Sequence, residues 1–181
     1  MYWLENKQRI IKEVFSYVKI FGVAAVIAFV VSRGIIVNAQ TPTDSMENTI
    51  MRGDRYFGFR LAYMFDEPQR QDIIIFKFPD NEKEIFVKRI IGVPGDVVEI
   101  KDDIVYVNGE PLDEPYLKEA MKLHQNMTFI VPDESYFVMG DNRNISNDAR
   151  YWKNTYVRKD QIIGKAMVKY YDGGITWKIM E

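Results

Sequence analysis

The chain contains no cysteine and only one histidine, His124, among its 181 residues. Without cysteine it can form no disulfide, thiolate nucleophile, iron–sulfur cluster or cysteine-ligated zinc site. One histidine cannot supply a two- or three-histidine metal centre, and a Ser-His-Asp triad would need that single residue. An excess of positive charge is also missing, since Lys+Arg number 24 and Asp+Glu number 26. We therefore expect no bound nucleic acid and no cysteine- or multi-histidine metal centre.

One long hydrophobic run lies near the N-terminus, where residues 20–31 read IFGVAAVIAFVV and GIIV follows Arg33. As a helix, residues 20–37 would be roughly 27 Å long, close to the thickness of a bilayer core. The alternatives are a secretory signal peptide and a buried helix, but the run is long for a signal peptide and lacks a clear cleavage site. Arg33 is close enough to the helix end to snorkel to the interface. The sequence predicts a single membrane-spanning helix over 18–37.

The orientation of this helix follows from the basic residues that precede it, which are Lys7, Arg9, Lys12 and Lys19. By the positive-inside rule, they place an N-terminal tail, residues 1–17, in the cytoplasm. We therefore expect a single-pass protein of the plasma membrane, held in the lipid bilayer, whose residues 38–181 are extracytoplasmic.

After residue 37 the pattern changes to short runs rich in β-branched and aromatic residues, separated by turn-forming residues. The expected strands cover 72–78, 84–92, 96–100, 104–107, 135–139 and 161–171. Asn108-Gly109 indicates a hairpin after one of them. Residues 110–134 read as an irregular excursion from the sheet. The pattern predicts a mainly β exported domain.

Ser45 lies in the sequence TPTDSMENT, residues 41–49, directly after the predicted span. Such a run of turn formers can expose a hydroxyl and direct successive backbone N–H groups into one concavity. Taken alone, the pattern is more typical of an ordinary solvated turn.

Lys88 and Arg89 are adjacent cations in a predicted strand, EIFVKRIIG, that is otherwise largely apolar on both faces. Because side chains alternate along a strand, one of the two must point toward hydrophobic surroundings. Desolvation there would lower the pKa of a lysine, and a neutral lysine can act as a general base. The alternative is an edge strand whose Lys and Arg both reach solvent.

The segment GDNRNISNDAR, residues 140–150, follows the predicted strand 135–139. It is compatible with an ordinary polar loop. Pairing of Asp148 with Arg150 or Arg89 would instead make the loop rigid enough for the Ser146 hydroxyl to orient a base.

In order and spacing, these segments resemble bacterial type I signal peptidases, the membrane-anchored Ser/Lys proteases that remove signal peptides from exported proteins. The matching elements are the N-terminal span, Asp44-Ser45-Met46, Arg52-Gly53-Asp54, the run KRIIGVPGD at 88–96, Gly140-Asp141-Asn142-Arg143, Ser146, Asp148 and Arg150. The short chain with one span is similar to the Gram-positive form. The resemblance implies an antiparallel β ectodomain of the signal-peptidase type with a small inserted cap, about 101–134.

The resemblance also implies roles for the residues around the serine. Ser45 would be the nucleophile and Lys88 the general base that accepts its proton. The Ser45 N–H and the Thr43 hydroxyl would hold the oxyanion. Met46 would line or support a pocket for small residues at positions −1 and −3 of the substrate. The implied substrates are signal-peptide-bearing preproteins with A-x-A-like junctions, and no metal or cofactor is required.

Supporting roles follow in the same way. Ser146 would hydrogen-bond Lys88 and orient it, while Asp148 with Arg150 and Arg89 would brace the loop.

Two positions depart from the family pattern. Asn48 replaces a proline that stiffens the nucleophile loop, and Ala149 replaces a serine. These departures leave open a second function, that of a signal-peptidase-like factor in pilus or surface-protein assembly with specialised or no proteolytic activity. A self-cleaving Ser/Lys protease related to the SOS-response repressors is a further alternative, but the chain has neither a DNA-binding domain nor an internal Ala-Gly-like cleavage site in a linker.

Overall fold

The computed structural model describes residues 2–180, except for the side chains of residues 2–6 and 8–11. The side chain of Arg9, one of the basic residues of the predicted cytoplasmic tail, therefore lies outside the described part. The chain divides into two compact units, Met1–Ile36 and Val37–Glu181.

The N-terminal unit is helical. Helix α1 covers Tyr2–Val30 and continues into a π-helical turn, η1, over Val31–Ile35. Within it, Lys12–Ile35 has the length and the apolar composition of a membrane-crossing helix. The helical conformation ends before the predicted boundary at residue 37, because Ile36 has extended backbone angles and begins strand β1, Ile36–Gln40.

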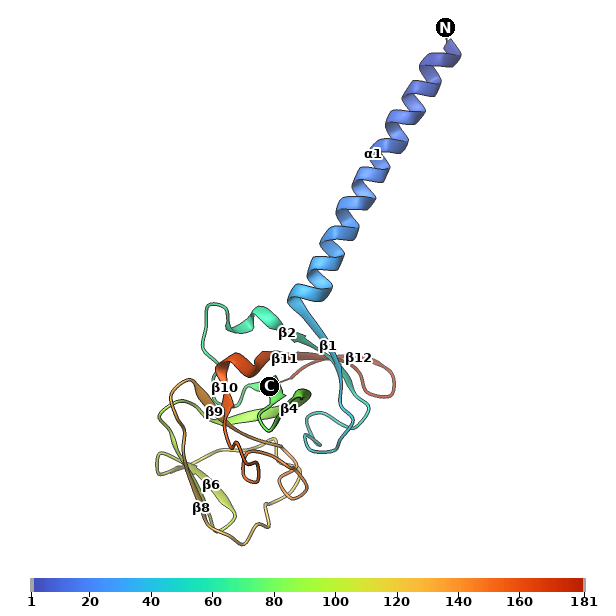
Figure 1. Ribbon diagram of the computed structural model, residues 1–181. Helices are drawn as coiled ribbons and strands as arrows, with labels where there is room; N and C mark the ends of the chain where they lie inside the picture. Colours follow the sequence, from blue (N-terminus) through green and yellow to red (C-terminus); the bar gives the residue numbers. More distant parts are fainter. Residues whose placement is uncertain (1, 181) are drawn as a thin grey trace. The chain divides into compact units, whose positions relative to one another are not determined.

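The C-terminal unit contains two sheets, and Figure 1 labels most of their strands. The larger sheet has the strand order β1-β2-β11-β3-β4-β9-β10, and β12 also pairs with β11. The pairs β2–β11, β11–β3, β3–β4 and β4–β9 are all antiparallel. The elements after β1 are β2 (Arg55–Phe59), the 3-10 turn η2 (Arg60–Tyr63), β3 (Ile73–Phe78), β4 (Asn81–Gly92), β9 (Ser135–Met139), β10 (Val157–Arg158), the 3-10 turn η3 (Lys159–Gln161), β11 (Ile162–Tyr171) and β12 (Ile175–Ile179).

The smaller sheet has the order β7-β6-β5-β8 and is antiparallel throughout. Its strands are β5 (Val97–Lys101), β6 (Ile104–Val107), β7 (Glu110–Pro111) and β8 (Met127–Ile130). Asn108 and Gly109, with φ of 54° and 87°, form the predicted hairpin turn between β6 and β7. The expectation that residues 110–134 are irregular is wrong for β7 and β8, which are too short for their alternation to be recognised. The predicted fold class, mainly antiparallel β with one N-terminal apolar helix, is confirmed.

Apolar side chains cover both faces of β3 in the larger sheet. Ile74 and Phe76 belong to a core cluster that continues into the smaller sheet, whereas Ile73 and Ile75 belong to a second cluster on the other face. Strand β4, between β3 and β9, is therefore a central strand, and a polar side chain in its middle has little access to water.

Candidate active site

Ser45 lies in the loop of residues 41–54, which joins β1 to β2. Backbone hydrogen bonds close this loop at its ends. Thr41 N donates to Asp54 O over 3.1 Å, and Gly53 N donates to Thr41 O over 2.8 Å. The chain between them is thereby held as a compact turn with Ser45 near its beginning.

Buried side chains anchor the rest of this loop to the core of the domain. Met46 and Ile50 are fully buried in the second core cluster, so Met46 supports the loop and does not face solvent. Lys169 of β11 pairs with Asp54 over 2.9 Å and also donates to Thr49 O over 3.3 Å. Sequence reasoning gave no role to Lys169, although the signal was the same as for the lysine of β4, a cation inside a largely apolar strand.

The structure brings Ser45 and Lys88 into direct contact. Lys88 Nζ lies 2.6 Å from Ser45 Oγ, and Thr43 Oγ1 lies 3.3 Å from the same oxygen. Lys88 is 4% exposed and Arg89 is 1% exposed. The edge-strand alternative is therefore wrong, because β4 is a central strand and both cations are buried.

Burial changes the acidity of Lys88. Desolvation of the ammonium lowers its pKa from 10.5 to about 8. The negative charges of Asp148 and Asp141 oppose this shift, and the positive charge of Arg150 reinforces it. Lys88 can therefore be neutral at mildly alkaline pH, in contact with a hydroxyl that could give it a proton.

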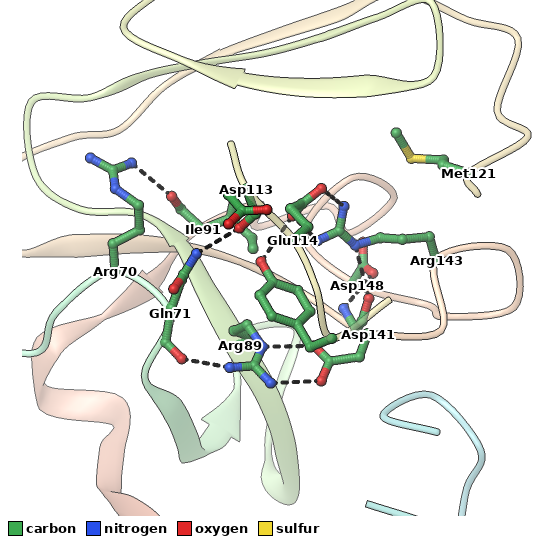
Figure 2. Close-up of polar contacts among 12 residues, drawn as sticks. Arg70, Gln71, Arg89, Ile91, Asp113, Glu114, Met121, Asp141, Arg143 and Asp148 are labelled. Atoms are coloured by element: carbon green, nitrogen blue, oxygen red, sulfur yellow. Dashed lines mark hydrogen bonds and ion pairs between the residues drawn. The ribbon is translucent and has the colours of Figure 1, made fainter. Parts of the chain in front are cut away.

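Arg89 is paired with Asp141 and not with Asp148. Its Nε and Nη2 donate to the two oxygens of Asp141 over 2.9 and 2.8 Å, and its Nη1 donates to Gln71 O over 2.9 Å, as Figure 2 shows. Thr49 Oγ1 donates to Asp141 over 2.5 Å. The alternative in which Arg89 pairs with Asp148 is thus wrong, and Arg89 contacts the 140–150 loop through Asp141, a partner that sequence reasoning missed although it is the second residue of the GDNR motif.

Asp148 pairs with Arg150, as one of the predicted alternatives has it. Both side chains are fully buried, with Arg150 Nε and Nη2 at 2.7 and 2.9 Å from the Asp148 carboxylate. Asp148 also accepts from Gly140 N over 3.0 Å, and Arg150 Nη2 donates to Arg143 O over 2.7 Å. The pair therefore ties the two ends of the 140–150 loop together.

The expected hydrogen bond from Lys88 to Ser146 is not formed. Ser146 Oγ is buried and has no hydrogen-bond partner, while Lys88 makes its bond to Ser45. The loop nevertheless packs closely on the serine, because a Cβ at Gly140 would lie 2.3 Å from Ser146 Oγ and 2.4 Å from Ser45 O. Glycine is required there for this approach.

A cavity of about 610 Å³ opens beside Ser45 and Lys88. Residues 37–40 of β1 and residues 85–88 of β4 contribute to its walls, and most of the lining is apolar. Strand β1 is the terminal strand of the larger sheet. A peptide bound in the cavity would therefore lie beside the edge of β1 and next to the Ser45 hydroxyl. Among the residues that the structure describes, no group of three His, Asp or Glu side chains is placed to hold a metal ion.

Comparison with known proteins points to one family. The family model described as signal peptidase, peptidase S26, matches residues 14–171. A probable signal peptidase I-2 from Synechocystis sp. is 37% identical over 155 residues, which cover 82% of this chain and 70% of that protein. Signal peptidase IB from Staphylococcus aureus (strain COL) is 33% identical over 177 residues, covering 88% of this chain and 91% of that protein.

A solved structure is also similar. The crystal structure of a signal peptidase I from Enterococcus faecalis V583 is 38% identical and matches with a TM-score of 0.49, covering 55% of this chain and 97% of that one.

Proposed function

We propose that this chain, which belongs to the peptidase S26 family of signal peptidases, cleaves preproteins. In this proposal Ser45 is the nucleophile and Lys88 is the general base. The observation that carries this assignment is the 2.6 Å contact between Lys88 Nζ and Ser45 Oγ. It lies in a buried site where desolvation lowers the pKa of the lysine. Both requirements of a Ser/Lys protease, proximity and a base that can be neutral, are met by the same two residues.

The reaction follows from this geometry. Neutral Lys88 accepts the Ser45 proton as Oγ attacks the carbonyl carbon of the substrate's −1 residue. The Ser45 N–H and the Thr43 hydroxyl hold the resulting oxyanion. The Lys88 ammonium then protonates the leaving amine of the mature protein, and an acyl-enzyme remains. Lys88 next takes a proton from water, which attacks the ester and releases the signal peptide while Ser45 regains its proton.

We assign the supporting residues to holding these groups in place. The Asp148–Arg150 pair keeps the 140–150 loop against Ser45, and Arg89 holds the start of that loop through Asp141. Ser146 Oγ, buried within the same loop, accepts a hydrogen bond from Lys88 once Ser45 Oγ has moved to the substrate carbon. Met46, which is buried in the second core cluster, supports the loop that carries Ser45.

Substrate selection follows from the cavity. An extended preprotein would lie along the edge of β1, where main-chain hydrogen bonds give affinity. The side chains at −1 and −3 would enter the apolar cavity, and the restriction to small residues there is the one that the family resemblance implies. Cleavage after small residues, as in A-x-A junctions, is the expected outcome.

The N-terminal helix anchors the enzyme where its substrates emerge. Lys12–Ile35 is long and apolar enough to cross a membrane. We assign residues 1–17 to the cytoplasm, 18–37 to the plasma membrane and 38–181 to the extracytoplasmic side, with a cap over about 101–134. The basic residues before the span support this orientation.

The test uses the detergent-solubilised full chain and a preprotein with one A-x-A junction. Mass spectrometry locates the cut in reactions with the parent, Ser45→Ala and Lys88→Ala. We expect cleavage directly after the −1 residue by the parent alone, with both variants folded by circular dichroism. Cleavage by folded Ser45→Ala would refute the assignment, whereas an inactive, folded parent would favour the assembly-factor alternative.

A further inference from the structure

The segment between β7 and β8 includes a short stretch, residues 113–118, that we call the strap. It has no regular strand pairing, yet side chains fix it to the rest of the domain. Gln71 Nε2 donates to Asp113 O over 2.9 Å, and Arg143 forms a bidentate pair with Glu114, as Figure 2 shows. Both members of that pair are nearly inaccessible to water. The strap is therefore held firmly at its beginning.

Asn48, three residues after the nucleophile, contacts the strap directly. Its Nδ2 donates to Tyr116 O over 3.0 Å and lies 3.5 Å from Leu117 O. The φ of Asn48 is +96°, a region that a residue with a side chain rarely adopts. Such a conformation persists only where the surroundings hold it, and the hydrogen bond to the strap is an interaction able to do so.

A second connection runs from the strap to the nucleophile itself. Lys118 Nζ lies 2.7 Å from Glu47 Oε2, and the same carboxylate oxygen accepts from Asn142 Nδ2 over 3.1 Å. Asn142 N in turn donates to Ser45 O over 3.1 Å. Lys118 of the strap is thus connected to the backbone carbonyl of Ser45 through Glu47 and Asn142.

The strap also packs against the strand that carries the lysine. The ring of Tyr116 lies 3.8 Å from the guanidinium of Arg89, the residue next to Lys88. A single segment therefore touches the loop of the nucleophile and the strand of the base.

We propose that Asn48 is a positioning residue, which ties the Ser45 loop to the strap and so keeps Ser45 Oγ within hydrogen-bonding distance of Lys88. This inference rests on the proposed function. It predicts two effects of removing the hydrogen bond from Asn48 to the strap. The hydroxyl would spend less time in the attacking geometry, so kcat would fall. Water would also reach Lys88 more easily, so the pKa seen in the pH profile would rise, because Asp141, Asp148 and Arg150, which surround the lysine, stay unchanged.

The experiment uses Asn48→Gly in the detergent-solubilised full chain. Glycine adopts a positive φ without strain but has no amide. Asn108→Gly is the matched control, since Asn108 also has a positive φ, of 54°, and its Nδ2 donates to Asp96 over 2.8 Å. It lies in the turn between β6 and β7, in the smaller sheet.

We expect Asn48→Gly to lower kcat about tenfold with KM changed less than about twofold, and to move the alkaline rise in activity to higher pH. Asn108→Gly should lower the melting temperature about as much as Asn48→Gly does, and it should leave kcat and the pH profile unchanged. Asn48→Asp, which keeps the shape but lacks the donor, should repeat the loss and guards against a folding failure of the glycine variant.

Parental kcat and pH profile in folded Asn48→Gly would overturn the inference, as would equal losses of kcat in both glycine variants. Inactivity of the parent, or cleavage by Ser45→Ala, would instead overturn the proposed function and this inference with it. A cleaving parent, an inactive Ser45→Ala and an unchanged Asn48→Gly would overturn the inference alone.

Discussion

Replacing Lys88 with methionine should abolish cleavage and yet stabilise the fold at neutral pH. The side chain is 4% exposed, and its burial lowers the pKa from 10.5 to about 8. That difference corresponds to roughly 3 kcal/mol, which burial of the charged ammonium costs the folded state. Methionine, of similar length and uncharged, avoids this cost but loses the hydrogen bond to Ser45, worth about 1 kcal/mol. The net gain in the free energy of unfolding at pH 7 is therefore about 2 kcal/mol.

The sign of this effect depends on pH in a definite way. Below about pH 8 the folded and unfolded parent both carry the proton on Lys88, so the full cost is present. Between about 8 and 10.5 the folded state has lost the proton and the unfolded state still binds it, so the parent gains stability as pH rises. The advantage of Lys88→Met should therefore disappear across this interval.

Urea unfolding of the full chain in mild detergent measures the difference, with the fluorescence of the buried Trp152 as one reporter of the β domain. Parent and variant are compared at pH 7 and pH 10, so that the other titrating groups cancel. In parallel, kcat/KM of the parent should rise about tenfold from pH 7 to pH 9, as the neutral fraction of a group with a pKa of about 8 grows from about one-tenth to about nine-tenths. A variant less stable than the parent at pH 7, a difference that does not shrink with pH, or a flat activity profile would refute the reasoning.

Three further outcomes are expected. Thr43→Val, which removes the hydroxyl 3.3 Å from Ser45 Oγ, should lower kcat about 10²- to 10³-fold with an unchanged melting temperature; an unchanged kcat would exclude Thr43 from the oxyanion site. Arg150→Met should cost about 3–5 kcal/mol, since it leaves the fully buried Asp148 unpaired, and should move the alkaline rise in activity to higher pH. Lys101→Met, which breaks an ion pair at a lysine 50% exposed, is its control and should change stability by less than about 1 kcal/mol. Excess EDTA should leave cleavage unchanged, and a loss that added divalent metal restores would contradict the mechanism.

Much of the β domain can be predicted because its strands combine apolar alternation with strong turn residues. The strands predicted over 104–107 and 135–139 coincide with β6 and β9, and Asn108-Gly109 forms the turn of the hairpin between β6 and β7. The burial of Lys88 could be predicted only as one of two alternatives, since a strand that is apolar on both faces favours the inside of a sheet but an edge strand is also compatible with the pattern. These features depend on residues that are close together in the sequence.

The partner of Arg89 could not be predicted in this way, because it depends on the register between two strands. Arg89 of β4 lies opposite Met139 of β9. Asp141 follows Met139 by two positions and so comes within reach of the guanidinium. Asp148 has the same charge and lies in the same loop, but the turn after Asp141 carries it toward Gly140 and Arg150. From the sequence pattern only Asp148 is predicted as a carboxylate partner of Arg89, because the register that brings Asp141 close is not visible in it.

These two ion pairs also explain why the lysine can be neutral at all. The negative charges of Asp141 and Asp148 act to raise the pKa of Lys88, whereas desolvation and Arg150 lower it. Each carboxylate is paired with its own arginine, Asp141 with Arg89 of β4 and Asp148 with Arg150, and desolvation is the largest effect on the pKa of Lys88. If Arg150 were uncharged, the field of Asp148 would act on Lys88 without compensation, and Lys88 would lose its proton only at higher pH. Arg150 therefore contributes to the lowered pKa of the proposed base as well as to the shape of its surroundings, and the pH profile of Arg150→Met separates these two contributions.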